Sequence, residues 1–202
     1  MEVRLKESEI EKIIIKNHGI LRTSDVINAG ISKASFYKYV RKSSNLKKAG
    51  HGIYISLDAW INELVLLQAH IPKTVYSHET ALYLHDLSEK EPMPLTVTVP
   101  SNYNNPNLLS EGIKTVYVKN DWYELGVSTV KAHTEFAMLT VYNMERTICD
   151  IIRKRSTMDP AIFNYAVRKY MKCQDKNLIR LTEYAKVMRL EKKIHETMGV
   201  LF

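Results

Sequence analysis

The sequence predicts an α+β fold, with a helical N-terminal domain that ends in a small hairpin and a mixed C-terminal domain with a small sheet and a helical end. Three observations predict this class. Apolar residues recur at helical spacing near the N-terminus, alternating strand-like segments lie in the middle of the chain, and the last quarter is again helical. Because Ile71-Pro72 stops a helix, we place the domain boundary there, which gives domains 1–71 and 72–202.

The N-terminal domain begins with a predicted helix over residues 2–17, whose apolar residues share one face. Ile20-Leu21 is expected to form a short strand. Thr23 or Ser24 should cap the next helix, because a hydroxyl there can accept from its unpaired N–H groups. Gly30 should end that helix in the left-handed conformation.

A second short helix is predicted over residues 33–42, capped by Ser32. Phe36 and Val40, one turn apart, are expected to point inward and to leave a polar outer face. Residues 46–56 then form a predicted hairpin with a Gly50-His51-Gly52 tip.

This order of elements, two helices joined by a turn and then a basic hairpin, is the pattern of a winged helix-turn-helix. In that fold the hairpin adds a contact with the DNA backbone or minor groove. The alternative is a small helical bundle whose charged face is merely solvated. Side chains of this face suit phosphates and base edges. The residues expected to bind DNA are Lys33, Ser35, Tyr37, Lys38, Arg41 and Lys42 on the helix and Lys47, Lys48 and His51 on the hairpin.

The remaining elements follow from periodicity and capping signals. Asp58 is expected to cap a helix of about thirteen residues that ends near His70. Ser77 should cap another, and Asp159-Pro160 is a strong helix start. The other predicted strands are 95–99, 113–118, 126–133 and 138–142, and the other predicted helices are 145–155, 159–172, 177–187 and 191–198.

The net charge of +7 is unevenly distributed. Residues 1–57 hold 11 Lys/Arg and 5 Asp/Glu, residues 58–151 hold 6 and 12, and residues 152–202 hold 12 and 5. A basic N-terminal block fits a nucleic-acid contact. The basic C-terminal block either covers the wet sides of helices or forms a second DNA-binding or acidic-partner surface, whose candidates are Arg168, Lys169, Lys172 and Arg180.

Cys149 and Cys173 lie in predicted helices without metal-ligand spacing, which indicates a reducing compartment and buried thiols. The charged N-terminus does not resemble a signal peptide, and no apolar run is long enough to span a bilayer. We therefore expect a cytoplasmic protein.

The search for chemistry yields no catalytic residue, cofactor or metal site. His78 and His85 are seven residues apart, which misses the HExxH spacing, and we interpret them as structural rather than as metal ligands. Glu191-Lys192-Lys193 has the spacing of a nuclease ExK half-motif but lies in a Lys-rich helix without a preceding strand-borne Asp. Arg146 and Asp150 are four residues apart on a predicted helix, a spacing that favours a structural ion pair. We expect no enzyme.

The order of features resembles the AbiEi antitoxin family of type IV toxin–antitoxin (abortive infection) systems. The resemblance covers nearly the whole chain. It rests on AGISKASFYKYV to GHGIYI, then SHETALYLHDLSEKEP with LTVTVP, and later VYNMERTICDII. Asp86 stands where a glycine commonly follows the Leu-His pair in relatives.

This resemblance implies a phage-defence autorepressor that binds operator inverted repeats upstream of its operon. It implies a C-terminal domain, residues 72–202, that counters a nucleotidyltransferase-like toxin without a stable complex. We expect a monomer in solution that binds DNA cooperatively. The alternatives are a regulator whose C-terminal half senses a small molecule, and a nuclease or nucleotide-modifying enzyme guided by the winged helix, which the missing carboxylate cluster argues against.

Overall fold

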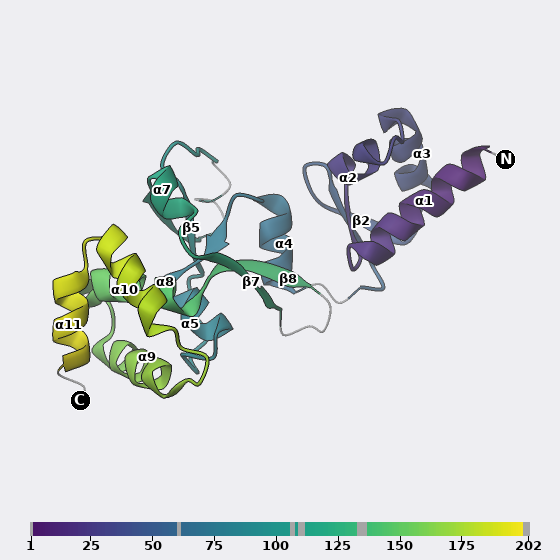
Figure 1. Ribbon diagram of the computed structural model, residues 1–202. Coiled ribbons are helices and arrows are strands. Elements are labelled where there is room, and N and C mark those ends of the chain that lie inside the picture. Colours follow the sequence, from purple (N-terminus) through teal and green to yellow (C-terminus); the bar gives the residue numbers. More distant parts are fainter. Residues whose placement is uncertain (1, 60–61, 106–107, 109–111, 133–136, 200–202) are drawn as a thin grey trace. The chain divides into compact units, whose positions relative to one another are not determined.

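The computed structural model describes residues 2–59, 62–105, 108, 112–132 and 137–199. The chain divides into two compact units, Met1–Pro72 with Lys131–Leu139, and Lys73–Val130 with Thr140–Phe202. Helices and two sheets are both present, so the predicted α+β class is confirmed (Figure 1). The division after Pro72 is one residue beyond the expected boundary, and residues 131–139, expected in the second domain, group with the first unit.

The first unit is a helical layer with a three-stranded antiparallel sheet of order β1-β3-β2. Its core is formed by apolar side chains from α1, β1, α2, α3 and β3, including Ile10, Leu21, Val26 and Phe36. The elements in chain order are α1 (Glu2–Lys16), β1 (Ile20–Arg22), α2 (Thr23–Asn28), α3 (Lys33–Lys42), β2 (Leu46–Gly50), β3 (Ile53–Ser56) and α4 (Glu63–His70).

The turn between α2 and α3 follows the sequence signals. Gly30 has φ of +81°, as expected for the residue after a helix end, and Ile31 is buried behind it. The Ser32 side chain accepts from the backbone N–H of Ser35, so α3 begins at Lys33 as predicted. The predicted capping of α2 is wrong: Arg22 is the residue before the helix, without a side-chain cap, and Thr23 is already helical.

The strand before the hairpin and the hairpin itself form as predicted. Ile20 pairs with Ile55 across β1 and β3, and β2 pairs with β3. The register shifts between Lys48 and Gly50, which marks a β-bulge next to the tip.

The predicted start of α4 is also wrong. The helix begins at Glu63 because the Asn62 side chain accepts from the backbone N–H of Leu64. Asp58 instead accepts from the Asn45 side chain. Trp60 and Ile61, which we expected on this helix, lie outside the described residues.

The second unit combines a mixed five-stranded sheet of order β6-β5-β4-β8-β7 with a helical end. Strands β5 and β6 are parallel, β4 and β5 antiparallel, and β4 and β8 parallel. Its elements are β4 (Val75–Tyr76), α5 (His78–Leu84), β5 (Thr96–Pro100), β6 (Lys114–Val118), α7 (Asn120–Tyr123), β7 (Val127–Lys131), β8 (Met138–Tyr142), α8 (Met144–Arg153), a 3₁₀ turn (Arg155–Thr157), α9 (Pro160–Lys172), α10 (Leu178–Val187) and α11 (Glu191–Gly199).

Helix α8 is the centre of the second unit, and Figure 1 shows α9, α10 and α11 around it. Its buried face packs with these helices in one cluster that includes Ile148, Ile152, Phe163 and Leu181. Side-chain caps from Asn143, Asp159 and Asn177 start α8, α9 and α10. These starts agree with the sequence signals to within one residue.

Three features of the second unit differ from the prediction or were not predicted. Ser77 precedes α5 but makes no side-chain cap, because its hydroxyl lies 3.0 Å from His78 Nδ1 instead. The two-residue strand β4 and the short helix α7 carried no recognisable period. Among the described helices, none combines the length and apolar character needed to cross a bilayer.

Candidate functional site

The first unit carries an exposed cationic face on α3 and the hairpin. No Asp or Glu occurs between Asp25 and Asp58. All six cations of that stretch are exposed, and none is in an ion pair with a residue that the structure describes. We call this set the cationic surface; it consists of Lys33, Lys38, Arg41, Lys42, Lys47 and Lys48.

The polar residues predicted to accompany these cations differ in exposure. Tyr37 is 40% exposed and His51 is exposed at the hairpin tip. Ser35 is half-buried, and its hydroxyl accepts from Ser32, 3.0 Å away. Ser35 therefore takes part in the cap of α3, a role that sequence reasoning did not assign to it.

The cationic surface rests on a packed layer. The Phe36 ring meets Tyr54 of β3 edge-on at 5.6 Å, so α3 and the hairpin share one core. Tyr39, at the margin of α3, is half-buried near α1. Burial, followed by the charges of Glu11 and Glu7, raises the pKa of its phenol. Because Phe36 and Tyr39 pack against the core, the opposite face of α3, which carries the cations, points to solvent.

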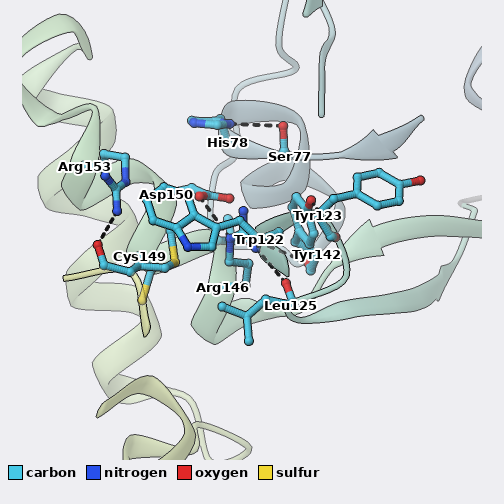
Figure 2. A network of polar contacts seen from close by, with 12 residues as sticks. Ser77, His78, Trp122, Tyr123, Leu125, Tyr142, Arg146, Cys149, Asp150 and Arg153 are labelled. Atoms are coloured by element: carbon cyan, nitrogen blue, oxygen red, sulfur yellow. Dashed lines mark hydrogen bonds and ion pairs between the residues drawn. The ribbon is translucent and has the colours of Figure 1, made fainter. Parts of the chain in front are cut away.

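In the second unit, by contrast, a cation is buried and paired, in the polar network shown in Figure 2. The Arg146 side chain is 1% exposed, and its Nε donates to Asp150 at 3.1 Å, the ion pair predicted from their spacing. Its guanidinium also donates to the carbonyls of Trp122 and Leu125 and lies 4.2 Å from the Tyr142 ring centre. Arg146 thereby attaches the segment around α7 to the start of α8.

Glycine is required where this segment passes Arg146. A Cβ on Gly126, whose φ is +79°, would lie 2.6 Å from Arg146 Cβ. The close approach leaves the Leu125 carbonyl 2.8 Å from the guanidinium. The network is therefore a packed structural element rather than an open cleft.

Glu145 is the second buried charge of α8. One of its carboxylate oxygens accepts from the backbone N–H of Asn177 at 2.9 Å and from the Tyr170 hydroxyl at 3.3 Å. Its other oxygen lies 3.7 Å from Arg180. Like Arg146, this side chain connects helices and is not presented to solvent.

The histidines and cysteines of the second unit have structural surroundings. His85 Nε2 lies 2.7 Å from the Tyr142 carbonyl, and burial lowers the pKa of this imidazole. Burial also lowers the pKa of His78, against the opposing charge of Asp150. Burial raises the pKa of the Cys149 thiol to about 12, so it is not an activated nucleophile. Among the described residues, no group of three or more His, Cys, Asp or Glu is placed to hold a metal ion.

The second candidate basic surface is only partly available. Arg168 and Lys172 are exposed on α9. Lys169 is half-buried and lies over the Tyr165 ring, and Arg180 is paired with Glu145. The cationic surface of the first unit is therefore the stronger candidate for a polyanion. The absence of Asp and Glu between Asp25 and Asp58 is a sequence signal for this surface that our sequence analysis did not use.

Comparison with known proteins supports the fold and gives no functional identity. No family model and no curated protein matches the chain. Among solved structures, the chain is similar to the crystal structure of the RV2827C protein from Mycobacterium tuberculosis. The TM-score is 0.55 at 13% sequence identity, over 91% of this chain and 75% of that one. At this identity the likeness concerns the fold alone.

Proposed function

We propose that the chain is a DNA-binding transcriptional repressor whose first unit acts as a winged helix-turn-helix domain. The observation that carries the proposal is the cationic surface: six exposed cations, without a described ion-pair partner, in a stretch without carboxylates. Unpaired surface cations suit phosphates, because binding releases the counterions condensed on the duplex. In this proposal α3 enters the major groove and the hairpin contacts the backbone or minor groove.

The second unit serves the antitoxin role in this proposal. The support is the resemblance in order of features to AbiEi antitoxins, whose members oppose a nucleotidyltransferase-like toxin. The protein then represses its own operon through upstream inverted repeats, in the cytoplasm, as a monomer that binds DNA cooperatively. We expect a gene for a nucleotidyltransferase-like toxin beside the coding sequence, and we expect co-expression of this chain to relieve the toxicity of its product. Absence of such a gene contradicts the antitoxin role.

The test of DNA binding is fluorescence anisotropy of the full chain with duplex from upstream of its own coding sequence, and with a scrambled duplex of equal length. If all six cations meet phosphates, the slope of log affinity against log salt is about −5. The upstream duplex should bind more tightly than the scrambled one at every salt concentration. Absence of binding to either duplex at low salt overturns the proposal.

A further inference from the structure

Thr23 connects the first turn of α2 to the tip of the hairpin. β1 ends at Arg22, which pairs with Ile53, so Thr23 comes to lie opposite Gly52. Its backbone N–H donates to the Gly52 carbonyl at 2.8 Å, and its hydroxyl donates to the same oxygen at 3.1 Å. One residue thus makes two hydrogen bonds to the hairpin tip.

The base of the hairpin is held independently. The backbone N–H of Leu57 donates to the Asn45 carbonyl at 2.9 Å, and the Asn45 side chain donates to Ser56 and Asp58 at 3.3 and 2.6 Å. Because these contacts close the base, the Thr23 hydroxyl is not needed to form the hairpin. Its effect is confined to the tip.

The tip carries His51, one of the hairpin residues proposed to contact DNA. His51 is exposed there, and Gly52 beside it has φ of +68°, a turn conformation that glycine adopts without strain. The β1–β3 ladder ends at the pair Arg22–Ile53, so beyond that pair the two hydrogen bonds from Thr23 are what restrict the Gly52 carbonyl. Removing the hydroxyl leaves one of these two bonds and a less restricted tip. Holding it in one position removes the entropy cost of ordering it on a ligand.

We infer that Thr23 is a positioning residue, whose hydroxyl fixes the hairpin tip so that His51 meets the DNA backbone at a set distance from α3. The inference rests on the proposed DNA binding and deepens it. Thr23 acts through the tip and makes no contact with DNA itself. Its contribution to affinity therefore depends on His51 and is independent of Lys38 on α3.

The test is a double-mutant cycle by anisotropy with the upstream duplex. Thr23→Val keeps the backbone N–H and the branched shape but removes the hydroxyl donor, and we expect affinity to fall about fivefold. Thr23→Ser, which restores the donor, should bind within about twofold of wild type. His51→Ala should cost about fivefold in wild type and almost nothing in the Thr23→Val background.

Lys38→Ala supplies the matched control, because its fold-loss should be the same in both backgrounds. Equal loss from His51→Ala in both backgrounds overturns the inference. Thr23→Ala is a second variant without the hydroxyl, for use if Thr23→Val destabilises the unit. It should show the same fivefold loss of DNA affinity with an unchanged urea midpoint of unfolding. If wild type does not bind the duplex, the proposed function fails; if wild type binds and both hydroxyl-free variants match it, only the role of Thr23 fails.

Discussion

Cations occupy opposite environments in the two units. On α3 and the hairpin, Lys38 and Arg41 are exposed and have no ion-pair partner among the described residues. In the polar network, Arg146 is buried and pairs with Asp150, two carbonyls and the face of Tyr142. Cationic side chains are therefore free to contact a ligand on α3 and the hairpin, whereas in the polar network they are buried and paired within the fold.

The number of cations in a segment therefore does not by itself identify a candidate binding surface. The last fifty residues are as basic as the first block, but Arg180 pairs with a buried carboxylate and Arg153 lies over Trp122. What distinguishes the cationic surface is that none of its six cations has an ion-pair partner among the described residues. Substitutions in the two environments should therefore separate stability from binding.

The largest effect is expected from Arg146→Met. Removal of the guanidinium leaves the buried Asp150 carboxylate without its counter-charge, which destabilises the protein by about 3 to 5 kcal/mol. The measurement is urea unfolding followed by Trp122 fluorescence in a Trp60→Phe background. Arg41→Met makes the same chemical change at an exposed site and should stay within about 0.5 kcal/mol. A loss below about 1 kcal/mol for Arg146→Met contradicts our account of the network.

A smaller effect, on binding alone, is expected from Lys38→Ala with Arg41→Ala. Loss of two phosphate contacts weakens upstream-DNA affinity about 10- to 100-fold and makes the salt slope less steep by about 2. Lys192→Ala with Lys193→Ala removes the same charge from exposed positions on α11 and should leave both quantities nearly unchanged. Equal weakening by both pairs means that binding follows net charge, and that α3 has no special role.

How far the sequence alone predicts the structure depends on where each side chain finds its partner. The bounds of α3, from Lys33 to Lys42, follow from a cap three residues away and a local apolar period, and both were predicted. Thr23 or Ser24 was expected to cap α2, but the Thr23 hydroxyl donates to Gly52, 29 residues further along the chain. A propensity for capping cannot reveal that competing partner.

The buried network shows the same limit. Asp150 is four residues from Arg146, so their pairing was visible in the sequence. The carbonyls of Trp122 and Leu125 lie 24 and 21 residues away and become acceptors only once the chain has folded. The candidate DNA-binding residues, in contrast, lie on one continuous stretch, so the sequence was sufficient to nominate them; whether they bind DNA stays a prediction.

The smallest effect is expected from two histidines of the second unit, His78 and His85. Burial lowers the pKa of His78 and His85 from the ordinary value of 6.5, so each takes up a proton at a lower pH in the folded chain than in the unfolded chain. Their contribution to stability is complete above the unfolded pKa and is lost as the pH falls below it.

We expect this loss to reach about 1 kcal/mol for each of the two histidines between about pH 7 and pH 5.5, above the range in which most carboxylates titrate. Urea unfolding across this range measures it, and His85→Gln should flatten the dependence by removing one of the two groups. If His85→Gln leaves the slope intact, the burial of His85 does not control the pH dependence of stability.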